Sequence, residues 1–257
     1  MAQDLNLRER TVVVLGPFST TVQNLMIHLT EAGADVALVD TNAHEFSRFC
    51  TNLTDQREAN PKLGRAIAVA SNLQDPQAIR DGLAKVAQSF GSIDIFIDAC
   101  LYNKTSPLDP TRSDYQWESE FANHLKPTMA ATQYVINFVK NRKRGRLLYL
   151  LNDSVGRGSP QNSLANLFRG GLVYWMKSLS RQLNDSNITV NCLSIGMTEE
   201  YLLGTYPECK TIQEALTQAK VADPFVKLTE PEKITNMIML LVSPLGSAIN
   251  GQHLVLT

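Results

Sequence analysis

The chain has 257 residues, 44% of them hydrophobic and 19% charged, and its 24 basic residues nearly balance 25 acidic ones. A formal net charge of −1 gives no overall field to hold a polyanion, so we do not expect a general nucleic-acid-binding protein. No apolar run approaches the ~20 residues of a membrane span, and MAQDLNLRER contains no apolar signal segment, so we expect a cytoplasmic protein without a membrane partner. The cysteines are far apart and form no CxxC pair, which argues against a metal site and against a disulfide framework.

In chain order, short apolar runs typical of strands alternate with segments of helical length. The pattern predicts a strand at 11–15, a helix over 22–32, a strand at 35–39, a helix from about 42, a strand at 65–70 and a helix over 76–90. It continues with a strand at 93–97, a long helix over 113–140, a strand at 146–151, a helix over 162–183, a strand at 188–194, helices near 211–220 and 231–241, and a strand at 253–256. Continuous apolar strands separated by helices indicate a parallel sheet that is covered on both faces. Because no linker or repeat interrupts the pattern, we expect one doubly wound α/β domain over residues 1–257.

Four segments carry a family resemblance: GSIDIFI at 91–97, GRLLYLL at 145–151, the stretch at 170–196, and SPLGSAINGQHLVL at 243–256. Their order and spacing resemble the classical short-chain dehydrogenase/reductases, particularly the β-ketoacyl-carrier-protein reductase type, over nearly the whole chain. The resemblance implies a Rossmann-like, mostly parallel seven-stranded sheet with helices on both faces. It also implies a nicotinamide dinucleotide cofactor and a lid segment over about 197–228.

The phosphate-binding loop departs from the family pattern. The family places TGxxxGxG after the first strand, so that backbone can approach the pyrophosphate at a helix N-terminus. Here the loop reads LGPFSTTV, in which Gly16 remains while Thr20 and Val22 occupy the other two glycine positions. Their Cβ atoms obstruct close backbone approach. Ser19 and Thr20 either cap the helix or offer hydroxyl and N–H groups to an anion.

Other cofactor positions are altered to different degrees. Asp40 ends the second strand, where NAD-preferring members bind the ribose hydroxyls, although a turn aspartate is an equal alternative. Asn72 replaces an aspartate that faces the adenine, and Thr198 matches a threonine that often contacts the carboxamide. DACL at 98–101 replaces NNAG, and Leu101 would crowd the path of the cofactor. We therefore expect no binding or weak binding of NAD(H) or NADP(H), with Asp40 favouring NAD.

The catalytic positions differ most. The family uses Asn, Ser, Tyr and Lys, with Tyr as the proton donor and Lys as the group that lowers its pKa. Alignment on the following GGL places Arg169 at the lysine position and Ala165 at the tyrosine position. Asn152 falls at the serine position with Ser154 two residues later, and His124 best matches the asparagine. Arginine keeps the charge, but alanine carries no proton.

Two principal functions follow from this pattern. The favoured hypothesis is a degenerate family member, non-catalytic or weakly catalytic, that acts as a regulatory, scaffolding or ligand-binding subunit of an oligomer. The alternative is an active NAD(P)-dependent carbonyl or acyl-type reductase with a rebuilt site, in which His124 titrates near neutrality and is a candidate replacement. A lyase or isomerase that uses His124 as a base is a minor third possibility.

Several segments suggest partners. In the family, helices corresponding to 113–140 and 162–183 build a dimer interface, so the resemblance implies a homodimer or a homotetramer. A protein partner, such as an active relative, is a further possibility. The lid carries Tyr201 and other apolar residues, which suit an acyl ligand, a protein partner or ordinary packing. A basic cluster near a helix C-terminus consists of Lys140, Arg142, Lys143, Arg144 and Arg146. It is either a solvated surface that suits the helix dipole or a patch for an acidic partner.

Overall fold

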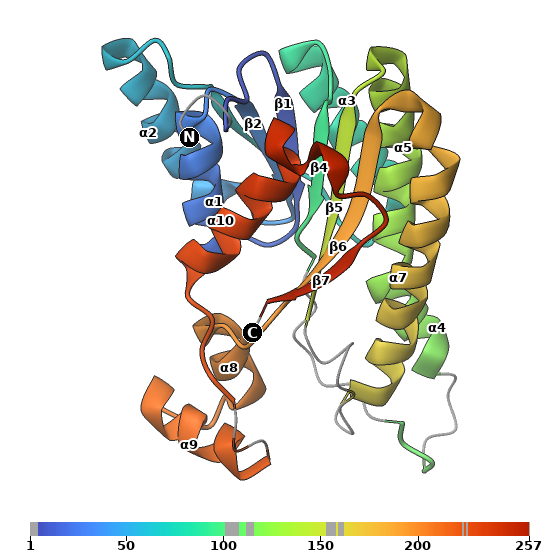
Figure 1. The fold of residues 1–257 in the computed structure, drawn as a ribbon. Coiled ribbons are helices and arrows are strands. Elements are labelled where there is room, and N and C mark those ends of the chain that lie inside the picture. The colour runs from blue at the N-terminus through green and yellow to red at the C-terminus, as the bar shows by residue number, and fades with distance from the viewer. Residues whose placement is uncertain are drawn as a thin grey trace.

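A computed structural model describes residues 5–100, 108–111, 116–152, 158, 162–222, 224 and 226–256. Within these residues, seven strands form one sheet of order β3-β2-β1-β4-β5-β6-β7, and every pairing is parallel (Figure 1). The doubly wound seven-stranded prediction is therefore confirmed. The strands are β1 (Thr11–Leu15), β2 (Asp35–Asp40), β3 (Ala66–Ala70), β4 (Ile95–Asp98), β5 (Gly145–Asn152), β6 (Ile188–Ile195) and β7 (His253–Leu256).

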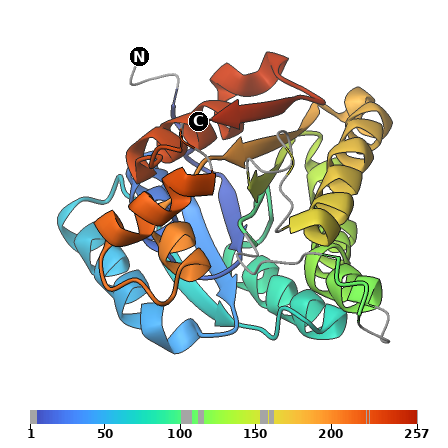
Figure 2. The same cartoon turned by 90° about the horizontal axis from the view of Figure 1, so that it is seen from below.

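Helices cover both faces of the sheet, which explains why the central strands are continuous apolar runs (Figures 1 and 2). Successive residues of β1 point to opposite faces, so that Val12 and Val14 join one core cluster while Val13 and Leu15 join the other. The first face carries α1 (Thr20–Glu31), α2 (Ala43–Ala59) and α10 (Pro231–Val242). The second face carries α3 (Pro76–Phe90), α5 (Lys126–Arg142) and α7 (Ser163–Gln182).

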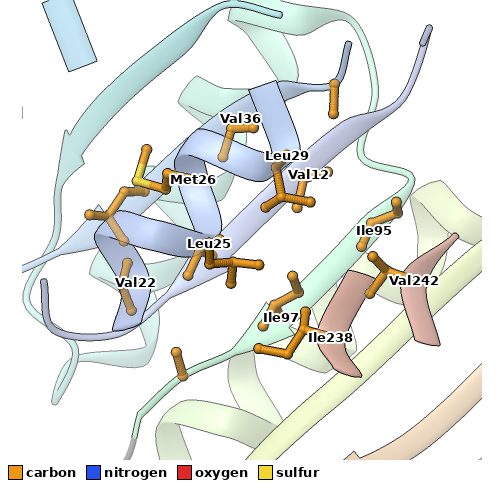
Figure 3. Close-up of a cluster of buried hydrophobic side chains, with 14 of the residues drawn as sticks. Val12, Val22, Leu25, Met26, Leu29, Val36, Ile95, Ile97, Ile238 and Val242 are labelled. Atoms are coloured by element: carbon orange, nitrogen blue, oxygen red, sulfur yellow. The ribbon is translucent and has the colours of Figure 1, made fainter. Parts of the chain in front are cut away.

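The core between α1, the sheet and α10 fixes the start of α1, which matters for the site below. Figure 3 shows the apolar side of α1 facing β1 and β4, with α10 beside it. Val22 and Leu25 of α1 are buried in the same cluster as Ile97 of β4 and Ile238 of α10. The helix is thus held rigidly against the two central strands.

The long helix predicted over 113–140 is wrong in one respect, because the structure has two helices there. α4 (Gln116–His124) ends before Leu125, and α5 begins at Lys126 with Pro127 in its first turn. Proline has no N–H and its ring clashes with the carbonyl four residues earlier, so it kinks or breaks a helix at this point.

The predicted lid segment contains two helices for which the apolar pattern gave only one. α8 (Glu199–Thr205) and α9 (Ile212–Ala222) lie at the lower end of the sheet in Figure 1 and share a small core of their own around Leu202, Ala215 and Ala219. Short 3₁₀ turns occur at Asn184–Ser186 and Pro244–Ala248. Among the described helices, none is long and apolar enough to cross a membrane.

Candidate functional site

The candidate site lies where the strand order reverses between β1 and β4. The loops after these strands lead to opposite faces, and ligands of doubly wound sheets bind in the crevice that results. A cavity of about 50 Å³, which we call the cleft, lies there. Its walls come from the segments after β1 and β4, from the ends of β5 and β6, and from α1 and α8: Pro17, Ser19, Thr21, Val22, Ala99, Leu150, Asn152, Ile195, Gly196, Thr198, Glu200 and Tyr201.

The turn after β1 keeps one glycine for a reason within the fold. Gly16 has a φ of +139°, and a Cβ added there would lie 2.6 Å from the carbonyl carbon of Ala99. Only glycine therefore allows the ends of β1 and β4 to approach this closely. Ser19 is the N-cap of α1, and its Oγ accepts a hydrogen bond of 3.1 Å from the Val22 N–H. Val22 is buried in the core, at the position where the family has a glycine.

A carboxylate from α8 occupies the start of α1. The Thr20 N–H donates a hydrogen bond of 2.7 Å to Oε1 of Glu200, which lies 180 residues away in the chain. The first turn of a helix attracts anions because its N–H groups have no helical partner and the helix dipole is positive there. Glu200 thus occupies an N–H group at the helix start, where the family resemblance predicts a pyrophosphate. The buried Thr21 hydroxyl lines the same cleft and has no hydrogen-bond partner among the described residues.

Asp40 lies at the end of β2, as predicted, but its carboxylate is already engaged. It is only 6% exposed and accepts hydrogen bonds from the Phe18 N–H at 3.3 Å and from the Thr41 N–H. The Phe18 ring packs at 4.9 Å from that of Phe46 and at 5.4 Å from that of Phe49, both on α2. This aromatic group lies beside the carboxylate that the prediction assigns to the ribose hydroxyls.

Of the remaining predicted cofactor residues, Thr198 lies at the cleft and Asn72 lies away from it. Thr198 lines the cleft and caps α8, because its Oγ1 accepts a hydrogen bond of 3.2 Å from the Tyr201 N–H. Asn72 is exposed in the turn before α3, where its Oδ1 accepts from the Gln74 N–H at 3.0 Å, and it does not line the cleft. Leu101 lies outside the described residues.

Asp98, which precedes Leu101, does not present a carboxylate to the cleft. It is buried at the end of β4 and accepts hydrogen bonds from the Thr128 hydroxyl and the Cys100 N–H. Burial raises the pKa of this carboxyl, and both hydrogen bonds oppose that effect.

The predicted catalytic positions meet in part. Ala165 and Arg169 lie one turn apart on α7, and both are buried. Asn152 ends β5, is 6% exposed and lines the cleft. His124 is the last residue of α4, but the position of its side chain, like all of Ser154, lies outside what the structure describes. The structure therefore brings Asn152 to the cleft and leaves an alanine at the tyrosine position.

One tyrosine at the cleft, Tyr201, was not assigned a catalytic role from the sequence. Tyr201 of α8 lines the cleft, and its Oη accepts a hydrogen bond of 3.4 Å from Nδ2 of Asn162. Burial lowers the pKa of the Arg169 guanidinium, and the nearby Tyr201 phenol and Glu120 carboxylate oppose that effect. The phenol and the buried cation are thus within electrostatic range of each other. The signal in the sequence is the position of Tyr201, three residues after Thr198, since the end of β6 faces the crevice.

In this conformation the cleft accommodates water-sized groups. Its volume is well below the ~300–1,000 Å³ of typical ligand sites, so a dinucleotide does not fit while Glu200 bonds Thr20. The Thr20 amide and the unpartnered Thr21 hydroxyl are nevertheless suited to phosphate oxygens. These two groups therefore fit the phosphate part of a dinucleotide once the Glu200 side chain turns aside. In the described part of the chain, no group of three or more His, Cys, Asp or Glu side chains could hold a metal ion.

Comparison with known proteins gives consistent results. A family model described as enoyl-(acyl carrier protein) reductase matches residues 25–257. The chain is 24% identical over 251 residues to the (2S)-[(R)-hydroxy(phenyl)methyl]succinyl-CoA dehydrogenase subunit BbsD of Thauera aromatica, covering 97% of this chain and 96% of the relative. It is 21% identical to the 3-oxoacyl-[acyl-carrier-protein] reductase FabG of Thermotoga maritima, covering 96% of each chain.

A solved structure shares the fold. L-sorbose reductase from Gluconobacter frateurii, complexed with NADPH and L-sorbose, superposes with a TM-score of 0.82 at 18% identity, covering 98% of this chain and 97% of the other. The family-model match extends over most of the chain, and the seven-stranded parallel sheet agrees with the solved structures. The chain belongs to the short-chain dehydrogenase/reductase family of NAD(P)-dependent oxidoreductases.

Proposed function

We propose that this protein is an NAD(P)(H)-linked oxidoreductase of the carbonyl or acyl-reductase type, in which Tyr201 serves as the proton donor and acceptor. The observation that carries this proposal is the Tyr201 phenol, which lines the cleft together with Asn152, while Ala165 stands at the family's tyrosine position. The relatives named above are dehydrogenases and reductases. They support this alternative from the sequence better than they support a loss of activity.

Each residue of the rebuilt site has a chemical role. Tyr201 gives its phenolic proton to the substrate oxygen during reduction and takes a proton back during oxidation. Arg169 is buried on α7 and keeps a positive charge at the family's lysine position. Asn152 has an amide that can donate a hydrogen bond to the same oxygen. A nicotinamide dinucleotide, when bound, supplies or accepts the hydride.

The cofactor-binding residues are those that surround the start of α1. Gly16 allows the close turn, Ser19 holds the helix N-terminus, and the Thr20 amide and Thr21 hydroxyl face the phosphate position. Asp40 favours NAD over NADP. The segment 197–228 acts as a lid, and Glu200 competes with the phosphate, so binding is weaker than in an open cleft.

A second candidate is a ligand-binding or regulatory subunit without turnover. Ala165 and the Glu200–Thr20 hydrogen bond favour it, because the first removes the family's acid and the second closes the phosphate position. The Thauera relative is named as a subunit of a dehydrogenase. A protein partner of related fold would therefore suit this candidate.

In either case we propose a homodimer or homotetramer formed through α4, α5 and α7. These helices lie side by side in Figure 1 and carry large hydrophobic side chains on their outer surface. Those with at least 40% exposure are Trp117, Phe121, Met129, Leu167 and Tyr174. Light scattering on the purified protein tests this assembly. The cytoplasmic location stays a prediction from the sequence.

A substrate screen with matched variants tests the proposed function. Ketones and β-ketoacyl thioesters are offered with NADH and NADPH to the wild type, Tyr201→Phe and the control Tyr206→Phe, another lid tyrosine. We expect turnover by the wild type, a fall in kcat of about 100-fold or more for Tyr201→Phe, and a change of less than about twofold for the control. Equal kcat in Tyr201→Phe would exclude Tyr201 as the acid. Saturable dinucleotide binding without turnover of any compound would favour the second candidate.

A further inference from the structure

Arginine side chains converge at the opposite end of the sheet, around the amino ends of β1, β4 and β5. Asp94 is fully buried before β4, and Nε of Arg144 donates to its Oδ1 at 2.9 Å. Arg10 and Arg142 approach the same oxygen only to 3.6 Å. Arg146, the second residue of β5, lies beside them. We call Arg10, Arg142, Arg144 and Arg146 the arginine cluster.

The charges within this group do not balance. Three guanidiniums approach the Asp94 carboxylate to 3.6 Å or less, and Arg146 lines the same cavity, so the cluster carries three more positive than negative charges in a partly buried region. Two more acidic residues lie at the rim: the exposed Glu9, whose backbone carbonyl accepts a hydrogen bond from Arg144, and Asp35, which pairs with Arg65. Burial lowers the pKa of both Arg10 and Arg146, and neighbouring guanidiniums lower it further, although Asp94 opposes this at Arg10. An anion placed among these side chains would relieve their repulsion.

A cavity of about 250 Å³ lies against two of these side chains. Arg10 and Arg146 line it together with Asn187 and Ser247, which supply polar groups. Nη1 of Arg146 donates to the Gly145 carbonyl at 2.8 Å, whereas its buried Nε has no hydrogen-bond partner among the described residues. Leaving a buried guanidinium N–H without an acceptor is costly. One donor without an acceptor and an unbalanced positive charge therefore occur together beside this cavity.

We propose that this cavity is a binding site for a small phosphate-bearing anion, held by Arg10 and Arg146. Guanidinium groups present paired N–H donors that match phosphate oxygens. A dianion offsets most of the three excess charges, whereas a single carboxylate would offset only one. The site lies at the amino ends of the strands, so it is distinct from the cleft at their carboxyl ends.

The shape of the site favours a small ligand over a macromolecule. The polar groups line a partly open cavity of about 250 Å³ rather than a flat stripe along the surface. The side chain of Arg10 is 28% exposed, so a phosphate group can reach it from solvent. A nucleic-acid backbone or an acidic protein would instead need an extended row of accessible cations.

Calorimetric titration with inorganic pyrophosphate at constant ionic strength tests the proposal on the full chain. We expect the wild type to bind pyrophosphate saturably, and Arg146→Gln and Arg10→Gln each to weaken binding about tenfold or more. Lys85→Gln removes one charge from the exposed side of α3, and Ser19→Ala alters the cleft. Both controls should change the affinity less than about twofold.

Specific results would overturn the proposal. These are the absence of saturable binding, equal loss in Lys85→Gln, or loss in Ser19→Ala without loss in the arginine variants, which would assign pyrophosphate to the cleft. Binding of a single-stranded oligonucleotide without binding of pyrophosphate would also overturn it. If Arg146→Gln does not fold by circular dichroism, Arg10→Gln decides alone, because Arg144 still pairs with Asp94 in that variant.

Discussion

The two ends of the sheet differ in their local charge. At the carboxyl ends of the strands, where a doubly wound fold is expected to bind an anion, the chain supplies its own carboxylate from Glu200 to the Thr20 amide. At the amino ends, where the fold provides no general anion site, Arg10, Arg142 and Arg144 share the buried carboxylate of Asp94 and Arg146 lies beside them. The fold places a helix N-terminus at the cleft, but individual side chains decide whether an external anion can use it.

The comparison also explains why the overall charge was uninformative. The nearly equal numbers of basic and acidic residues conceal a local positive excess at one end and an internally neutralised site at the other. Net charge governs the field far from the protein. It does not describe cavities a few ångströms across.

The largest expected effect comes from removing the carboxylate at the amino end. Asp94→Asn should lower the free energy of unfolding by about 3–5 kcal/mol, because Arg10, Arg142 and Arg144 would face one another without their common counter-charge. Urea denaturation measures this loss, with Asp81→Asn on the exposed surface of α3 as the control. A loss below about 1 kcal/mol would contradict this prediction, because it would show that the stability of the arginine cluster does not depend on Asp94.

A smaller effect is expected from the turn at the carboxyl end. Gly16→Ala should destabilise the protein by about 2–3 kcal/mol even without any cofactor, because φ is +139° and the new Cβ meets the Ala99 backbone at 2.6 Å. Gly171→Ala is the matched control. It lies exposed on α7 with open space around it, and should stabilise by up to about 1 kcal/mol. Unchanged thermal stability of Gly16→Ala would mean that the glycine serves only a ligand.

The smallest expected effect comes from the titration of His253 on β7, which belongs neither to the cleft nor to the arginine cluster. Burial, and then the nearby Lys177, lower the pKa of His253, whose Nε2 lies 2.7 Å from Oγ of Ser194. Protons therefore bind the unfolded chain more tightly, so this contribution to stability is present above pH 6.5 and is lost as the pH falls below that value. His253→Gln should show a smaller loss of stability between pH 7.5 and 5.5 than the wild type in urea unfolding. An identical loss in the two proteins would mean that a group other than His253 causes the pH dependence.

Most of the fold was predictable because burial imposes simple patterns. The strand runs at 11–15 and 188–194 are continuously apolar since helices cover both faces, and they occur within one residue of the observed strands. The break at Leu125 was missed although Pro127 signals it, because the apolar pattern continues from α4 into α5. α8 was missed because its seven residues are too few for a periodic pattern.

Residues of the candidate site could be predicted only where a local sequence match identifies their position. Ala165, Arg169 and Asn152 could be located by register with neighbouring segments. The bond between Thr20 and Glu200 joins residues 180 positions apart, and nothing in either local sequence indicates it. The packing of Phe18 on α2 and the convergence of arginines on Asp94 likewise depend on tertiary contacts.

The most direct test of the central claim, that Glu200 competes with a dinucleotide for the start of α1, is a fluorescence titration with NADH and NADPH. Wild type, Glu200→Ala and Glu199→Ala are compared, the last removing a neighbouring exposed carboxylate from the same helix turn. We predict saturable binding that becomes about tenfold tighter in Glu200→Ala and changes less than about twofold in Glu199→Ala. Equal affinity in all three proteins, or no saturable binding by any of them, would contradict the account.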